Sequence, residues 1–322
     1  MNTPVNTPMN TLFVLPSRGW SSSTAALQRL ADQADGRLDV RFLPDGRMTA
    51  AHMDCAEVIF GFPDPAALLS APQLQWLHLP SSGADPYVDL RLYANRQVTL
   101  TTSAGVYGAP MAEHILMLFL MLARGYRRDD PDEAYDTPRE LNGSTVVLLG
   151  LGDVGRTLAA RLSSFATTTL GIRRNLWDKP PHVHELLDLN SLKPALARAD
   201  FVVSSLPLTR ETQHLLNADA FNAMKPGAIF VNVGRGAVVD TDALTDALAR
   251  GHLAGTGLDV TDPEPLPADH PLCTMPNVIL TPHIAGASCE VPQRRFAFFE
   301  KQLARYLAGR RLHNVVDFFR GY

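Results

Sequence analysis

One glycine cluster in the chain has a spacing that suits phosphate binding. Gly150, Gly152 and Gly155 form a G-x-G-x-x-G pattern between the apolar run TVVLLG and the helical pattern RTLAARLSSF. Glycines at this spacing allow a tight turn and let a pyrophosphate approach backbone N–H groups at a helix N-terminus. Because a strand precedes the pattern and a helix follows it, residues 150–155, with Asp153 and Val154 between the glycines, are predicted to bind a dinucleotide.

The next strand-like run, TTTLGI, ends at two basic residues, Arg173 and Arg174. In NAD-specific folds this position usually holds an acidic residue that binds the adenosine ribose hydroxyls. A carboxylate would repel a 2′-phosphate, whereas a guanidinium can form two charge-assisted hydrogen bonds with it. We therefore expect NADP(H) to be preferred, and NAD(H) stays open as a second cofactor. The alternative is that both arginines are solvated surface residues.

Three further polar segments each follow an apolar run: VGRG at 233–236, DVTDPEP at 259–265 and TPHIAG at 281–286. In a doubly wound sheet the carboxyl ends of the strands face the cofactor crevice. This rule places Arg235, Asp259 and His283 on the same side as the glycine turn, where they can converge. Taken one by one, such residues are more often ion-pair partners, solvated turn residues or structural histidines.

The elements that must position these residues form two α/β series. The 322 residues suffice for two domains, and both halves alternate apolar runs with helical stretches. Runs that are apolar at consecutive positions suit parallel strands buried on both faces. A long apolar helix is expected within 103–131, and a last helix at 294–309 can return to the first domain. The expected strands are LFVLP, VRFLP, EVIFGF, LQWLHL, VTLTT, TVVLLG, TTTLGI, FVVSSL, AIFVNV and NVILTP.

Composition excludes several classes of protein. The 29 Lys and Arg against 33 Asp and Glu give a formal charge of -4, without the basic excess of a nucleic-acid binder. Cys55, Cys273 and Cys289 form no close pair of the kind that zinc sites or small disulfide scaffolds need, so no metal site and a reducing cytoplasm are expected. The longest apolar stretch, 115–123, is about half a membrane span, so no membrane partner is expected.

Four motifs together carry a resemblance to a known family. The segments GLGDVG, SSLPLTRET, KPGAIFVNVGRGAVVDTDALTDALARGHLAGTGLDVTDPEPLP and TPHIAG resemble the D-isomer-specific 2-hydroxyacid dehydrogenase family over nearly the whole chain. The basic GIRR resembles the NADP-preferring glyoxylate/hydroxypyruvate reductase group. The resemblance implies two doubly wound parallel-sheet domains with an interdomain cleft. These are a flavodoxin-like substrate domain, 1–104 plus 290–322, and a Rossmann cofactor domain, 105–289. Residues 110–142 resemble the family's dimer contact, which implies a homodimer.

The same resemblance implies that Arg235, Glu264 and His283 are the catalytic residues. Arg235 would hold a 2-oxo acid and stabilise the negative charge that grows on its ketone oxygen as hydride arrives. His283 would donate a proton to the developing alkoxide, oriented by the Glu264 carboxylate. The activity implied is NADPH-dependent reduction of a small 2-oxo acid, of the glyoxylate or hydroxypyruvate type, to the D-2-hydroxy acid.

Other family positions carry over with a binding role. Asp259 matches the residue that contacts the nicotinamide carboxamide, and the backbone N–H groups of Ser82 and Gly83 would face the substrate carboxylate. His78, His114 and Trp76 have no such match and are expected to be packing or surface residues. The remaining expected cofactor contacts are Ser204, Leu206, Pro207, Thr212, Val233, Gly234 and Gly286.

Two other functions stay open on this fold. Formate dehydrogenases of the family carry Gln where Glu264 stands, which disfavours that activity, whereas phosphite oxidation is less clearly excluded. A nucleotide-sensing corepressor is the alternative from a different class. A corepressor would have no reason for fast turnover, so measuring turnover separates the two.

Overall fold

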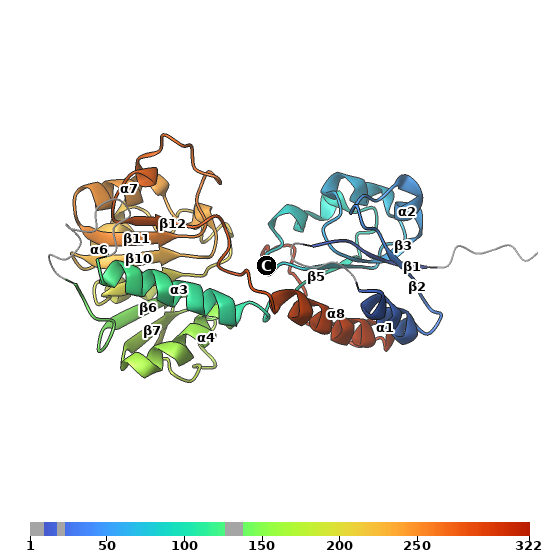
Figure 1. The fold of residues 1–322 in the computed structure, drawn as a ribbon, viewed down its shortest axis with the longest axis horizontal. Helices are drawn as coiled ribbons and strands as arrows, with labels where there is room; N and C mark the ends of the chain where they lie inside the picture. The colour runs from blue at the N-terminus through green and yellow to red at the C-terminus, as the bar shows by residue number, and fades with distance from the viewer. Residues whose placement is uncertain (1–9, 18–22, 126–137) are drawn as a thin grey trace, which may run out of the picture. The chain divides into compact units, whose positions relative to one another are not determined.

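The computed structural model describes residues 10–17, 23–125 and 138–322. The chain divides into two compact units. Unit 1 comprises Met1–Val106 and Ser288–Tyr322, and unit 2 comprises Tyr107–Ala287. Each division falls two residues from the boundary expected after 104 or after 289. Both units are built on parallel sheets (Figure 1).

Unit 1 contains a five-stranded parallel sheet with the order β2-β1-β3-β4-β5. This order is that of flavodoxin-like folds, which confirms the expected architecture. Its strands are short, and all except the half-exposed edge strand β2 are largely buried, because apolar residues face both sides of the sheet. They are β1 (Thr11–Val14), β2 (Asp39–Phe42), β3 (Ala56–Phe60), β4 (Trp76–Leu79) and β5 (Thr99–Thr102).

Helices from both ends of the sequence cover one face of this sheet. The helix α1 (Thr24–Ala34) lies beside α8 (Val291–Leu307), as Figure 1 shows. Arg29 Nε bonds Glu300 Oε1 at 2.7 Å, and Phe299 stacks on Phe60 with ring centroids 4.2 Å apart. The last helix therefore returns to the first unit, as the sequence predicts. The short helix α2 (Ala50–Cys55) contributes Met53 to the core on the other face.

A histidine lies in the core of unit 1 with a hydrogen-bond partner at each ring nitrogen. His78 in β4 is fully buried, with Nδ1 2.7 Å from Thr101 Oγ1 and Nε2 3.0 Å from Ser103 Oγ. Trp76 Nε1 donates to the same Thr101 oxygen at 2.7 Å. Burial lowers the pKa of His78 to about 3, so the ring is neutral at physiological pH.

Unit 2 contains a seven-stranded parallel sheet with the order β12-β11-β10-β9-β6-β7-β8. Read from β8, this is the 3-2-1-4-5-6 order of a Rossmann fold with one further strand, as expected. The order reverses between β6 and β9, which pair directly. The strands are β6 (Thr145–Leu149), β7 (Thr168–Ile172), β8 (Glu185–Leu187), β9 (Phe201–Ser204), β10 (Ala228–Asn232), β11 (Leu253–Leu258) and β12 (Val278–Leu280).

Successive residues of each strand in unit 2 serve two different cores. In β6, Val146 and Leu148 pack toward one face, and Val147 and Leu149 pack toward the other. The first face is covered by α3 (Gly108–Ala123) and α4 (Asp153–Leu162), which lie next to each other (Figure 1). The second is covered by α5 (Leu192–Leu196), α6 (Ala218–Ala223) and α7 (Thr241–Ala249). Burial on both faces explains why these strands lack polar alternation.

Two strands were not among those expected, and one helix is narrower than its expected range. Strand β8 was missed because its three residues are only half-buried and stand among polar residues, and β11 was missed because its sequence, LAGTGL, contains two glycines and a threonine. The long helix expected within 103–131 is confirmed, and it begins at Gly108 and ends at Ala123. Of the predicted dimer arm, 126–137 lie outside the described residues. Across the described residues no helix is long and apolar enough to span a membrane, and no three His, Cys, Asp or Glu side chains gather as metal ligands.

Candidate active site

The glycine turn joins β6 to α4 at the point where the strand order reverses. Gly150 adopts φ +97°, which opens the turn, and a Cβ on Gly155 would overlap the carbonyl oxygen of Gly150. Gly152, the N-cap of α4, has no heavy atom within 4 Å of its would-be Cβ. The backbone N–H groups of the first helical turn have no partner within the helix and carry its positive dipole end. The turn thus has the shape and the donors that a pyrophosphate needs.

The Asp153 carboxylate faces the start of another helix. Its Oδ2 accepts the backbone N–H of Gly108 at 2.6 Å, so the first turn of α4 is joined to the first turn of α3. Val154 is half-buried and packs on the core between these helices. A cofactor contact by Asp153 or Val154 would therefore come from the backbone, because the side chains already have partners.

The loop after β9 is closed by its own hydrogen bonds. Thr212 Oγ1 donates to the carbonyl of Pro207 at 2.7 Å and accepts the N–H of Thr209 at 2.8 Å. Leu206 is buried, and the Ser204 hydroxyl is a buried group without a hydrogen-bond partner in the described part of the chain. The Ser204 side chain therefore lies behind the loop surface, and a cofactor contact there would use backbone atoms.

The basic pair lies at the carboxyl end of β7. Arg173 Nη1 donates to the carbonyl of Asp178 at 3.2 Å, and its backbone N–H extends the pairing to Leu187. The Arg174 side chain is 44% exposed and its Nη2 lies 2.5 Å from Glu211 Oε2. Both guanidinium groups are thus positioned at the strand end where an adenosine ribose is bound in dinucleotide folds.

The turn that carries Arg235 is held by a buried asparagine. Asn232, the last residue of β10, accepts the N–H of Gly234 at 3.1 Å and donates to the carbonyl of Arg235 at 2.9 Å. A Cβ on Gly234 would meet the backbone of Leu206. The Arg235 Nη1 donates to the carbonyl of Gly234 at 2.8 Å. The backbone that carries the Arg235 side chain is therefore held by the Asn232 amide and by its close packing against the loop after β9.

Asp259, directly after β11, organises the turn that carries His283. Its Oδ1 accepts Thr281 Oγ1 at 2.6 Å and the N–H of Ile284 at 2.8 Å. Its Oδ2 accepts the N–H of Ala285 at 2.8 Å, and its backbone carbonyl accepts the N–H of His283 at 3.0 Å. The side chain is only 2% exposed. A buried carboxylate with three donors fixes this turn strongly.

His283 and Glu264 form the central contact of the candidate site. Nδ1 of His283 lies 2.7 Å from Oε1 of Glu264, and the two side chains are 53% and 43% exposed. A carboxylate accepts the Nδ1 proton, which leaves Nε2 as the atom that can act on a substrate. His283 has φ +54°, a left-handed conformation that costs about 1–2 kcal/mol in a residue other than glycine. Such strain persists where the surrounding bonds of a functional site impose it.

Comparison with known proteins assigns the chain to a family. Residues 118–285 match the family model described as D-isomer specific 2-hydroxyacid dehydrogenase, NAD binding domain. The protein belongs to the D-isomer specific 2-hydroxyacid dehydrogenase family. The family assignment made from the motifs is thereby confirmed, and unit 2 contains the NAD-binding domain.

Relatives of this dehydrogenase include reductases that match over most of their length. The glyoxylate reductase of Thermofilum pendens is 37% identical over 261 residues, 76% of each chain. The glyoxylate/hydroxypyruvate reductase B of Pectobacterium carotovorum is 32% identical over 317 residues, 92% of this chain and 98% of the relative. The crystal structure of a D-isomer specific 2-hydroxyacid dehydrogenase from Xanthobacter autotrophicus, in complex with NADPH and MES, has a TM-score of 0.80 and 31% identity. It covers 97% of this chain and 100% of that one.

The predicted substrate loop of the dehydrogenase follows β4 in unit 1. Ser81 Oγ donates to the carbonyl of Gly83 at 2.5 Å, and the carbonyl of Ser81 accepts the N–H of Ser103 at 2.8 Å. Among the residues that the structure describes, the N–H groups of Ser82 and Gly83 donate to no protein acceptor. The loop thus presents two adjacent backbone donors, the arrangement that suits a carboxylate.

Sequence reasoning missed the role of His114 on α3. Its Nε2 lies 3.0 Å from Thr281 Oγ1 and 3.8 Å from Asp259 Oδ1. Thr281 uses its single proton on Asp259, so Nε2 of His114 must be the donor. Burial lowers the pKa of His114, against the opposing charge of Asp259. Sequence reasoning missed Asn232 as well. Gly286, which was predicted as a cofactor contact, packs against the start of α3, where its would-be Cβ lies 3.1 Å from Tyr107.

Proposed function

We propose that this dehydrogenase reduces a small 2-oxo acid, of the glyoxylate or hydroxypyruvate type, to the D-2-hydroxy acid, with NADPH as the preferred reductant. The observation that carries the proposal is the 2.7 Å contact between His283 and Glu264 at the carboxyl end of a Rossmann sheet. Reduction of a ketone needs a proton donor beside the hydride donor, and this pair supplies one.

His283 acts as the proton donor in the proposed reaction. Glu264 holds Nδ1–H and stabilises the imidazolium, so that Nε2–H points to the ketone oxygen of the substrate. As the alkoxide forms, the Nε2 proton moves to it and the ring becomes neutral. The backbone of Asp259 and its carboxylate keep the His283 turn in place during this transfer.

Arg235 supplies the positive charge in the proposed reaction. A 2-oxo acid carries a carboxylate beside its ketone, and a guanidinium can donate to both. Charge on the ketone oxygen grows as the carbon is reduced, so a fixed cation beside it stabilises the transition state more than the substrate. The N–H groups of Ser82 and Gly83 are proposed to bind the substrate carboxylate.

The residues of unit 2 fit a nicotinamide dinucleotide. The open approach to Gly152 suits the pyrophosphate, and the two guanidinium groups after β7 suit a 2′-phosphate. When bound, NADPH would supply the hydride for the ketone carbon. NADH remains an allowed, weaker donor in this proposal.

The proposed function is tested by following NADPH and NADH absorbance with a panel of 2-oxo acids. We expect the highest kcat/KM for glyoxylate or hydroxypyruvate with NADPH, and a D-configured product from hydroxypyruvate. No turnover with any oxo acid, despite nucleotide binding, would favour a nucleotide-sensing protein. Turnover of phosphite with NADP⁺ alone would favour a phosphite dehydrogenase.

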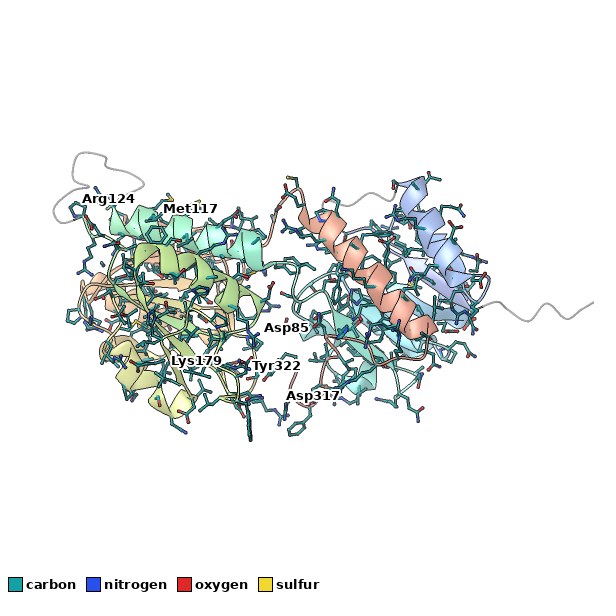
Figure 2. All side chains as sticks on the ribbon, turned by 90° about the horizontal axis from the view of Figure 1, so that it is seen from below. Asp85, Met117, Arg124, Lys179, Asp317 and Tyr322 are labelled. Atoms are coloured by element: carbon teal, nitrogen blue, oxygen red, sulfur yellow. The ribbon has the colours of Figure 1, made fainter. Side chains whose placement is uncertain are left out.

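A homodimer built on α3 is proposed as well. Met117 and Leu120, three positions apart on this helix, are 42% and 37% exposed, and Met117 projects from its outer side (Figure 2). Light scattering is expected to give twice the chain mass for the wild type and a monomer for Met117→Glu combined with Leu120→Glu. A wild-type monomer at micromolar concentration would contradict the dimer.

A further inference from the structure

Arg174 carries a carboxylate partner that comes from a different loop. Nη2 of Arg174, after β7, lies 2.5 Å from Oε2 of Glu211, in the loop after β9. The two side chains are 44% and 62% exposed, so both are within reach of a ligand. Thr212, the next residue, closes this loop by its hydrogen bonds to Pro207 and Thr209. These bonds hold the backbone at Glu211 in place.

The position of this carboxylate has a chemical meaning in a dinucleotide fold. NAD-specific folds place an acidic side chain after the second strand, where it accepts hydrogen bonds from the ribose hydroxyls. Here that strand ends in arginines, and the neighbouring loop brings a carboxylate to the same place. Two other carboxylates near the strand end have different partners: Asp178 lies 3.7 Å from Arg156, and Asp188, which follows β8, accepts hydrogen bonds from Asn190 and Ser191. Glu211, by contrast, forms an ion pair with Arg174.

We propose that Glu211 determines the cofactor specificity of this enzyme by competing with the 2′-phosphate for Arg174. With NADP(H), the phosphate displaces the carboxylate and takes the guanidinium. With NAD(H), Glu211 stays on Arg174 and accepts a hydrogen bond from the ribose 2′-hydroxyl. This inference rests on the proposed function in placing the adenosine ribose at Arg173 and Arg174.

The competition predicts opposite effects on the two cofactors when Glu211 is made neutral. In Glu211→Gln the 2′-phosphate no longer displaces an ion pair or meets a like charge, so the KM for NADPH should fall about threefold to fivefold, the scale of an exposed ion pair. The KM for NADH should rise by a similar factor, because an amide accepts a weaker hydrogen bond than a carboxylate. The ratio of kcat/KM for NADPH over NADH should thus increase about tenfold.

A matched control separates this effect from a general change in charge. Glu185 in β8 pairs with Arg198 at 2.6 Å and is 45% exposed, so Glu185→Gln removes the same charge from a similar surface ion pair. Glu185→Gln should leave the cofactor ratio within about twofold of the wild type. A second comparison, Glu211→Gln in an Arg174→Ala background, should abolish the gain for NADPH, because the gain acts through Arg174.

Binding of 2′-AMP and 5′-AMP, measured by calorimetry, gives a readout that needs no turnover. Affinity for 2′-AMP should rise in Glu211→Gln about as much as the KM for NADPH falls, while affinity for 5′-AMP should not rise. An unchanged cofactor ratio in Glu211→Gln, or an equal change in Glu185→Gln, would overturn the inference. A wild type that prefers NADH would refute the proposed NADPH preference only, since Glu211 is judged by the change in ratio.

Discussion

Gly236 packs against the backbone of Thr261, so closely that a Cβ on Gly236 would overlap the carbonyl group of Thr261. The turn after β10, which carries Arg235, and the turn after β11, which leads to Glu264, therefore touch backbone to backbone. This contact explains how Arg235 and Glu264, which are far apart in the sequence, can belong to one site in unit 2.

The contact predicts a large effect for the smallest possible substitution. Gly236→Ala should separate the two turns and lower the free energy of unfolding by about 1–3 kcal/mol, the usual cost of overpacking. The kcat for a 2-oxo acid should fall by about tenfold to a hundredfold, because misplacing a catalytic group by about 1 Å can cost up to about 10²-fold. Urea unfolding and steady-state kinetics measure both. Wild-type stability in the variant would mean that the turns do not need this approach.

A change at His283 can separate chemistry from folding. Asn tolerates the left-handed backbone that His283 adopts at φ +54°, so His283→Asn should keep the fold. The asparagine side chain has no acidic proton that it could transfer to the substrate. We expect kcat to fall by about 10²–10⁴, the contribution of a general acid. The dissociation constant for NADPH should change less than about twofold, because the proton transfer that His283 performs is not part of cofactor binding. Fast turnover by His283→Asn would remove the assignment.

The glycine turn and the strand ends could be predicted because their signals are local. Gly150, Gly152 and Gly155 adjoin one apolar run and one helical pattern, so a short window of sequence contains the whole motif. The family motifs likewise carried Arg235, Glu264 and His283, whose roles stay predictions until they are measured. Strand β8 escaped because Glu185–Leu187 offers three half-buried residues and no apolar run.

The supporting hydrogen bonds could not be predicted because their partners are distant in the chain. His114 and Thr281 are separated by 167 positions, and Asp153 and Gly108 by 45. A histidine on an apolar helix gives no sign of which turn it will meet. Neither the buried partners of Asp259 nor the ion pair between Arg174 and Glu211 leaves a periodic trace in the sequence.

Removing the charge of Asp259 should loosen the His283 turn. In Asp259→Asn the side chain keeps one acceptor oxygen and gains an NH₂ that faces donors, so at least one N–H at 284 or 285 loses its partner. Each buried donor left without an acceptor costs about 1–3 kcal/mol. We expect a lower thermal midpoint and a lower kcat together. A crystal structure of the variant with an unchanged 281–285 turn would contradict this account.

Acid should destabilise the enzyme through His78. Burial holds the pKa of His78 at about 3 in the folded chain, below its unfolded value of 6.5, so below pH 6.5 the unfolded chain binds a proton that the folded chain does not. Stability is therefore fully present above pH 6.5 and falls by up to about 1.4 kcal/mol per pH unit as the pH drops from 6.5 toward 3.

Replacing His78 by glutamine, whose side-chain amide does not titrate, should remove this dependence of stability on pH. The donors and acceptors around His78 form one directed chain: Trp76 donates to Thr101, and Thr101 donates to Nδ1. Nε2–H then donates to Ser103, which donates to the carbonyl of Leu79. His78→Gln should be less stable than the wild type at pH 7.5, with a deficit that shrinks on acidification to pH 5. Urea unfolding at both pH values measures it, with the exposed His313→Gln as control. A deficit that stays constant with pH would show that His78 is not the acid-sensitive group.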